Sequence, residues 1–192
     1  KYGFLPEMLL EMYNERKETK KLMLKAEQEY EDTKHPQLLN LISRYKNKQM
    51  ALKIALNSAY GAIGNQYFRF YDIRIAEAVT YSGQLSIRWI EIALNKYLNE
   101  LLKTEDIDYI LASDTDSVYI TFESLVEKLQ PKDPVKFLDT ICKETLEPFI
   151  SKKYQELADY TNAYEQKMVM GREVIADKGI WTAKKRYILN VH

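Results

Sequence analysis

Residues 109–120 read YILASDTDSVYI, an apolar run and an alternating run with two aspartates between them. Two short β-type runs around a polar turn are typical of a β-hairpin, so the sequence predicts one with Asp114 and Asp116 at its turn. Residues i and i+2 of a strand share a face, which would let both carboxylates meet one metal ion. Oxygen ligands without nearby histidine or cysteine clusters favour Mg²⁺ or Mn²⁺ over zinc. The alternative is a polar turn that only caps the hairpin.

Composition limits the class of protein. The 192 residues are 46% hydrophobic and 29% charged, which is enough to bury a core. The formal net charge is zero, with 28 basic and 28 acidic residues, so any nucleic-acid-binding surface must be local. The single cysteine, Cys142, excludes an intrachain disulfide framework and is expected in the core. Neither a signal peptide nor an apolar run of bilayer length is evident, so we expect a cytoplasmic location.

Both ends of the chain look cut. It opens at Lys1 in helix-like sequence, and it stops at His192 directly after the strand-like run RYILNV. A domain rarely ends on a strand without a turn, so we expect a fragment of a longer protein.

The first half of the chain predicts helices. Residues 6–31 and 37–60 carry helix-forming residues with apolar steps of three, four or seven, and a short turn separates them. Two such segments form an antiparallel helical hairpin. Asp72 is expected to cap a third helix that ends near residue 102. The apolar or small positions of that helix are Ala76, Val79, Gly83, Ile87, Ile90, Leu94, Tyr97 and Leu101.

The second half mixes helix and strand. Residues 134–162 predict a helix with a kink or break at Pro148. Residues 168–176 and 185–191 predict strands, joined by a turn at Asp177-Lys178-Gly179. This order predicts an α+β fold, in which a long antiparallel helical hairpin accompanies a small antiparallel β-sheet backed by helices.

Cations interrupt the apolar faces of the first two helices. Arg16 and Lys20 are four residues apart, and Lys53 touches the apolar seam at Leu52 and Leu56. Cations that lean inward need an anionic partner, and three of them on two facing helices suit a polyphosphate. The alternative is a solvated helix pair whose lysines extend to water.

Three motifs, in this order, resemble those of the family B DNA polymerases. KIALNSAYG at residues 53–61 is similar to motif B, YILASDTDSVYI to motif C, and Lys184-Lys185-Arg186-Tyr187 to the KKRY motif. The form NSAYGAIGN and the stretch Asn14-Glu15-Arg16-Lys17 look closest to replicative polymerases of tailed bacteriophages. The resemblance covers essentially the whole chain.

The resemblance implies part of a template-directed DNA polymerase that transfers nucleotidyl groups from dNTPs to a primer 3′-OH with two Mg²⁺ ions, or Mn²⁺ in their place. Residues 1–62 would form the fingers and residues 63–192 part of the palm. The implied catalytic residues are Asp116, Asp114 and Lys53. The implied metal ligands are Asp116, Asp114 and, through MGREVIA, Glu173 on a strand beside the hairpin. For Glu173 an exposed strand glutamate is the alternative.

The resemblance also implies contacts to substrates. The cations would offset triphosphate charge, and the KKRY motif would hold the primer near its 3′ end. The implied nucleotide-binding residues are Arg16, Lys20, Lys53, Asn57 and Tyr60. The implied DNA-binding residues are Tyr60, Gly61, Lys184, Lys185, Arg186 and Tyr187. The partners would be primer-template DNA and dNTPs, with no membrane, in the host cytoplasm if the chain is of phage origin.

Parts of the family pattern are missing. The sequence has no DxxSLYP-like motif A, and the exonuclease and thumb domains are absent. We therefore expect the chain alone to be nearly inactive and to need an upstream segment or subunit that carries motif A. Two other functions stay open. One is a non-catalytic module that binds primer-template or a subunit. The other is an Asp-x-Asp nucleotide-sugar transferase, which leaves motif B and KKRY unexplained.

Overall fold

The computed structural model describes residues 3–192, and the chain forms two compact units that divide between Val79 and Thr80. Most of the described residues are helical, and two small antiparallel sheets accompany the helices. The predicted α+β class is therefore confirmed.

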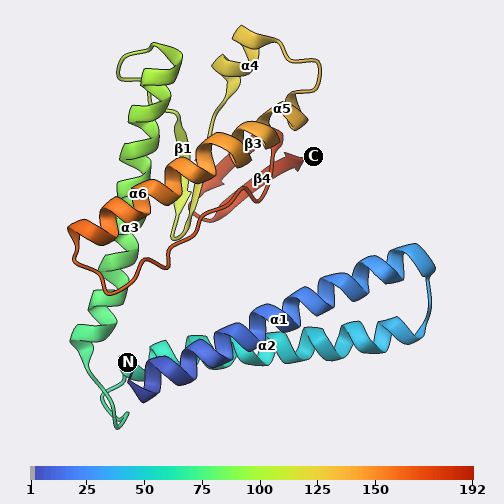
Figure 1. The fold of residues 1–192 in the computed structure, drawn as a ribbon, viewed down its shortest axis with the longest axis vertical. Coiled ribbons are helices and arrows are strands. Elements are labelled where there is room, and N and C mark those ends of the chain that lie inside the picture. The colour runs from blue at the N-terminus through green and yellow to red at the C-terminus, as the bar shows by residue number, and fades with distance from the viewer. Residues whose placement is uncertain (1–2) are drawn as a thin grey trace. The chain divides into compact units, whose positions relative to one another are not determined.

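The first unit contains a helical hairpin. Helices α1 (Phe4–Thr33) and α2 (Gln37–Ile63) run antiparallel along each other (Figure 1). Lys34 ends α1 in the left-handed region with φ 53°, and its N–H donates to the Tyr30 carbonyl at 2.7 Å. The Lys48 ammonium joins α2 to Glu15 of α1 at 2.7 Å. The predicted hairpin is confirmed, and α2 continues through Gly61 to Ile63.

Helix α3 (Ile73–Leu102) begins where the sequence predicts. The Asp72 carboxylate accepts a hydrogen bond from the backbone N–H of Arg74 at 3.0 Å, which is the geometry of an N-terminal cap. A hydrogen bond from the Arg74 guanidinium lowers the pKa of Asp72.

The buried stripe of α3 differs in part from the predicted one. Ile90 and Leu94 are buried as predicted, but Leu98 and Leu102 continue the stripe, while Leu101 is 48% exposed. The reason is a change of partner, because the end of α3 packs on Tyr109 and on α4 (Glu123–Leu129). The buried face of α3 is therefore rotated about the helix axis near the C-terminal end, compared with the middle of the helix.

The second unit holds two β-hairpins. Strands β1 (Ile110–Asp114) and β2 (Ser117–Ile120) pair antiparallel around a two-residue turn, which confirms the hairpin predicted from YILASDTDSVYI. Strands β3 (Ala176–Ala183) and β4 (Arg186–Val191) form the other two-stranded sheet.

Two sequence predictions are wrong near the second hairpin. Residues 168–175 are irregular rather than a strand, and Asp177-Lys178-Gly179 lie inside β3 rather than in a turn. A Cβ at Gly179 would stand 2.7 Å from the Trp181 ring and 2.8 Å from Leu189. The glycine therefore allows a close side-chain approach within a strand, and the turn falls at Lys184-Lys185.

Further helices cover the core of the second unit. Helix α5 (Pro134–Ile141) leads through the π-helical turn η1 (Cys142–Leu146) into α6 (Glu147–Tyr160). The predicted kink or break near Pro148 is confirmed, because the π-helical η1 gives way to α6 at Glu147, directly before Pro148. The sequence interpretation missed α4, whose seven residues are too few for a clear period.

The core of the second unit forms where α3 meets α6. One buried cluster contains Ile90, Leu94, Leu146, Ile150, Tyr154 and Leu157. Cys142 packs beside this cluster, and burial raises the pKa of its thiol, so the predicted core role is confirmed. Across residues 3–192, no helix has both the length and the apolar character that crossing a bilayer requires.

Candidate active site

The turn of the first hairpin has an unusual backbone. Asp114 ends β1, but Asp116 lies in the turn itself and not two residues along the same strand, as the alternation argument assumed. The Asp116 N–H donates to the Asp114 carbonyl at 2.6 Å across Thr115, whose φ is 57°. A β-branched residue in the left-handed region is strained. The turn thus holds two carboxylates close in sequence at a conformational cost.

Asp114 is half-buried and has partners from both hairpins. The Thr115 hydroxyl donates to its Oδ1 at 2.9 Å, and Lys185 Nζ lies 3.3 Å from the same oxygen. The Thr115 hydrogen bond, followed by Lys185 and the charge of Lys184, lowers the pKa of Asp114. This carboxylate is therefore held in its charged form beside the KKRY turn.

Asp116 has a different environment. Its side chain is exposed, and within residues 3–192 it has no ion-pair or hydrogen-bond partner. Its charge adds to the effect of burial in raising the pKa of Tyr154 on α6. The Asp116 carboxylate is thus available to a ligand.

The KKRY motif forms the turn and first residues of the second hairpin. Lys184 and Lys185 make the turn, with Lys185 at φ 64°, and Arg186 and Tyr187 open β4. The Tyr187 ring meets Tyr119 of β2 edge to face at 5.3 Å. A hydrogen bond with Tyr187 raises the pKa of Tyr119. Two motifs far apart in the sequence therefore meet in the second unit.

Glu173 does not occupy the predicted strand. It is exposed on the irregular segment 168–175. Its neighbour Arg172 pairs with Asp139 of α5, and the Arg172 N–H donates to Glu147 Oε1 at 2.9 Å. Over the described residues, no three Asp, Glu, His or Cys side chains are grouped for a metal ion, so Glu173 does not join Asp114 and Asp116 in such a group. Its role as a metal ligand stays a prediction.

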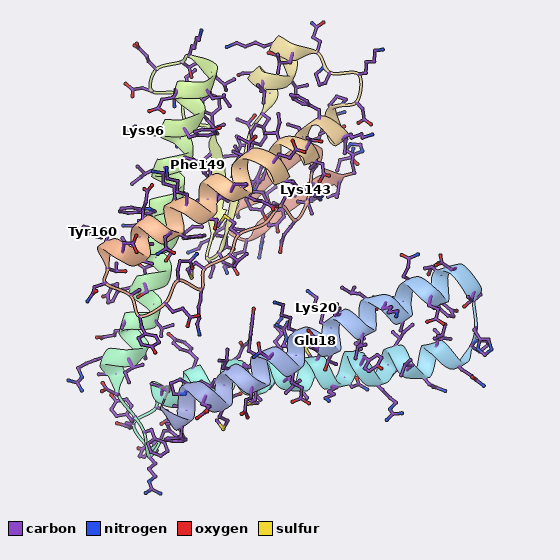
Figure 2. All side chains as sticks on the ribbon, in the orientation of Figure 1. Glu18, Lys20, Lys96, Lys143, Phe149 and Tyr160 are labelled. Atoms are coloured by element: carbon purple, nitrogen blue, oxygen red, sulfur yellow. The ribbon has the colours of Figure 1, made fainter. Side chains whose placement is uncertain are left out.

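The three cations of the helical hairpin differ from each other. Lys20 projects from α1 (Figure 2), and both Lys20 and Lys53 are exposed, so the prediction that they lean into the apolar seam is wrong. Long lysine stems can lie along a helix while the ammonium stays in water. Arg16 is half-buried, and its Nε is buried without a hydrogen bond. In the part of the chain that the structure describes, none of the three pairs with a carboxylate.

Helix geometry gives the spacing of these cations. Lys20 lies five residues beyond Glu15 on α1, and Lys53 lies five residues beyond Lys48 on α2. Because the helices are antiparallel, the two lysines lie on opposite sides of the Glu15–Lys48 ion pair, about 15 Å apart along the axis. Arg16 lies between them along the axis, so the three cations are spread along the helical pair.

The other motif B residues lie in the last turns of α2. Asn57 and Tyr60 are exposed, and the Tyr60 hydroxyl donates to the Ala76 carbonyl at 3.5 Å. A Cβ added at Gly61 would meet no atom within 4 Å, so packing in the first unit does not explain the glycine.

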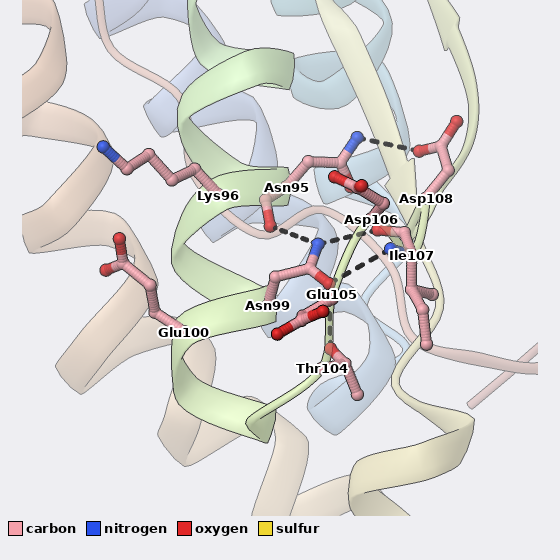
Figure 3. Close-up of a pocket in the computed structure, with 9 residues that line it drawn as sticks. All are labelled: Asn95, Lys96, Asn99, Glu100, Thr104, Glu105, Asp106, Ile107 and Asp108. Carbon is pink, nitrogen blue, oxygen red and sulfur yellow. Dashed lines mark hydrogen bonds between the residues drawn. The ribbon is translucent and has the colours of Figure 1, made fainter.

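A separate hollow of about 780 Å³ lies at the end of α3 (Figure 3). Asn95 donates to Asp108 and accepts from the Tyr109 N–H, both at 2.8 Å. Asn99 donates to the Ile107 carbonyl at 2.8 Å. These amides tie α3 to the start of β1, so the hollow has a structural explanation that the sequence interpretation did not anticipate.

The donors at the first turn suit part of a magnesium site. Mg²⁺ prefers hard oxygen ligands and is commonly bound by one or two carboxylates together with water and phosphate. Asp116 is exposed and Asp114 is held charged, so both residues fit that ligand class.

Comparisons with known proteins agree with the motifs. The pattern of DNA polymerase family B matches residues 1–189. The DNA-directed DNA polymerase of Enterobacteria phage T4 is 44% identical over 158 residues, 75% of this chain and 18% of that protein. That of Escherichia phage RB69 is 41% identical over 157 residues, 74% of this chain and 17% of that protein.

A viral relative extends the match along the chain. The DNA polymerase beta of African swine fever virus (isolate Warthog/Namibia/Wart80/1980) is 31% identical over 206 aligned positions, 97% of this chain and 16% of that protein. The chain thus spans less than a fifth of the length of these relatives. The chain belongs to DNA polymerase family B.

Proposed function

We propose that this chain is part of a template-directed DNA polymerase and supplies its triphosphate-binding cations and part of its metal site. The observation that carries the proposal is the contact between Lys185 Nζ and Asp114 Oδ1 at 3.3 Å. This contact connects the Thr115-Asp116 turn, which we propose binds metal, with the Lys184-Lys185 turn, which we propose binds the primer end. A nucleotidyl transfer needs these two functions side by side.

The second unit would carry the reacting end of the primer. Asp116 and Asp114 would hold Mg²⁺, which when bound makes the primer hydroxyl more acidic and offsets charge on the leaving pyrophosphate. Lys185 and Tyr187 would position the primer 3′ end beside these carboxylates. Lys184 and Arg186 would bind backbone phosphates, which places the duplex without reading its sequence.

The first unit would bind the incoming nucleotide. The absence of carboxylate partners for Arg16, Lys20 and Lys53 within residues 3–192 supports a role in binding the triphosphate. Asn57 would lie near the same nucleotide. Tyr60 and Gly61 would contact the nascent base pair and test its shape, because the minor groove distinguishes base pairs poorly by hydrogen bonds.

The proposed division is fingers at residues 1–62 and partial palm at residues 63–192. A further metal-binding carboxylate would come from a segment that carries motif A, with Glu173 as a candidate within this chain. Primer-template DNA and dNTPs would be the partners. Residues 1–192 alone would then extend primers little or not at all, and efficient template-directed synthesis by the chain alone would overturn this requirement.

A segment exchange tests the proposal. Residues 1–189, which the family pattern covers, would replace the corresponding family B segment of the phage RB69 polymerase. The exchanged enzyme should extend a primer in a template- and Mg²⁺-dependent manner. Asp116→Ala should lower the incorporation rate by about a thousandfold, the upper range for one electrostatic group aimed at a transition state.

Glu127→Ala provides a matched control, because Glu127 is an exposed carboxylate on α4 of the same unit. This variant should stay within about twofold of the parent rate, as expected for a surface substitution. Extension that survives Asp116→Ala would contradict the site assignment. An exchanged enzyme that binds primer-template in a salt-sensitive manner but never extends it would favour a non-catalytic module.

A further inference from the structure

Three aromatic rings connect the two hairpins of the second unit. Tyr119 of β2 meets Trp181 of β3 at 5.5 Å and Tyr187 of β4 at 5.3 Å, both edge to face. Trp181 and Tyr187 stack at 6.2 Å. Because β1–β2 and β3–β4 are separate sheets, no backbone ladder joins them. The contact between the hairpins therefore depends on side chains, and we call these three residues the aromatic cluster.

The aromatic cluster lies close to both turns in sequence and register. Tyr119 is in the short strand that follows the Thr115-Asp116 turn, and Trp181 pairs with Tyr187 just before the Lys184-Lys185 turn. The ion pair between Lys185 and Asp114 also joins the turns, but the Lys185 side chain is 64% exposed. Exposed ion pairs contribute little, whereas an aromatic contact adds to the gain from burial. The rings are thus expected to contribute more to this connection than the ion pair does.

Two costly features surround Trp181. Its Nε1 is buried without a hydrogen-bond partner, which is unfavourable for an indole. Its ring also covers Gly179 so closely that a Cβ there would collide with it at 2.7 Å. The indole has both features while it contacts Tyr119 and Tyr187. On the opposite face of the same hairpin, Ile180 and Ile188 are 64% and 74% exposed.

We propose that Trp181 is a positioning residue that holds the Lys184-Lys185 turn of the KKRY motif against the Thr115-Asp116 turn, called here the carboxylate turn. It acts through Tyr187 and Tyr119, so the primer-binding and metal-binding groups keep one relative position. The inference deepens the proposed function and rests on it for the identity of the two ligands. The contact itself can be tested without any assumption about activity.

The functional test uses the exchanged RB69 polymerase. Trp181→Ala should raise the half-saturating concentration of primer-template about tenfold, the upper range for one aromatic contact, and leave that of the dNTP within about twofold. Trp181→Phe restores a ring and removes the unpaired N–H, so primer-template binding should return to within about threefold of the parent value. A general structural defect would not spare dNTP binding or respond to phenylalanine.

Two further variants keep the test decisive. Gly179→Ala should displace the indole and weaken primer-template binding, which keeps the proposal testable if Trp181→Ala does not fold. Ile180→Ala, on the exposed face of the same strand, should leave primer-template binding unchanged. Equal effects of Ile180→Ala and Trp181→Ala on primer-template binding, or unchanged binding by the Gly179→Ala enzyme, would overturn the proposal.

Fluorescence separates this inference from the proposed function. The chain has two tryptophans, so Trp89→Phe leaves Trp181 as the only tryptophan in residues 1–192, and its emission can be excited selectively over that of the tyrosines. Acrylamide should quench Trp181 weakly, and Tyr119→Ala should increase the quenching while Ile180→Ala should not. Equal quenching in both variants would overturn the contact. Protected fluorescence in a chain whose exchanged enzyme never extends primers would support the contact and count against the polymerase role.

Discussion

The two units differ in how much side-chain surface they bury. Among the described residues of α1 and α2, the buried side chains are Thr19, Ala26 and Gln49. In the second unit, Ile90 and Leu94 are fully buried, and the carboxylate hairpin packs on their cluster through Ile110, Val118 and Ile120. The proposed phosphate-binding cations thus lie on a thinly packed helical pair, and the proposed metal ligands lie on a core.

This difference suits a polymerase in which the parts have separate tasks. Elements that move during a reaction cycle are drawn from regions of low local stability, whereas catalytic carboxylates need a rigid support. The helical pair would close on the triphosphate while the second unit keeps the carboxylate turn in place.

The largest stability effect is expected in the core of the second unit. Leu94→Ala should lower the free energy of unfolding by about 2–5 kcal/mol, because it leaves a cavity at a fully buried site. Leu101→Ala, on the same helix but 48% exposed, should cost less than about 1 kcal/mol. Urea unfolding of both variants measures the contrast, and equal losses would show that the buried stripe of α3 is misassigned.

A difference in local opening should follow from the difference in packing. Backbone amides in the middle of α1 and α2 should exchange with solvent at least about tenfold faster than amides of α3 at residues 88–98. Hydrogen exchange followed by mass spectrometry on the 192-residue chain measures both regions in one sample. Equal protection of the two regions would remove the contrast between a mobile pair and a rigid support.

Much of this architecture follows from local sequence patterns. Long helical periods predict α1 and α2. A short polar turn between two β-type runs predicts the hairpin of β1 and β2. The apolar residues of segment 168–175 favour a strand, but none forms there because no other segment of residues 3–192 pairs with it as a strand. Gly179 was predicted in a turn, because the sequence does not distinguish a glycine that a turn needs from one that lets a side chain approach closely.

The candidate site was predictable as a set of residues but not as an arrangement. The motifs identified Asp114 and Lys185, but their contact depends on how two hairpins pack, which no local pattern encodes. Trp181 was not singled out, because its importance appears only when its neighbours Tyr119 and Tyr187 are known. The predicted inward lean of Lys20 and Lys53 was wrong, because a lysine at an apolar step can still extend to water.

A smaller effect is expected where the irregular segment is tied to α5. Hydrogen bonding from Lys143, followed by Arg172, lowers the pKa of Asp139 in the folded protein. A depressed carboxyl pKa adds stability above the unfolded value of about 3.9, and this stability disappears as the pH falls through the folded pKa.

Asp139→Asn should therefore lower the urea midpoint slightly at pH 7, and the difference from the parent chain should shrink at acidic pH, as the pH falls through the folded pKa of the Asp139 carboxyl group. Glu127→Gln serves as the control and should leave the midpoint unchanged at both pH values. A deficit of Asp139→Asn that stays constant with pH would mean that the ion pair does not stabilise this region.

The separation of tasks between the units is tested most directly by one titration. Single-nucleotide incorporation by the exchanged polymerase would be measured against dNTP concentration for Lys53→Ala and Asp116→Ala, with Lys25→Ala as an exposed lysine control on α1. Lys53→Ala should raise the half-saturating dNTP concentration about tenfold, as for one charge-assisted contact, and recover much of its rate at saturation. Asp116→Ala should stay slow at every concentration. Recovery of Asp116→Ala at high dNTP, or a Lys53→Ala defect no larger than that of Lys25→Ala, would contradict the account.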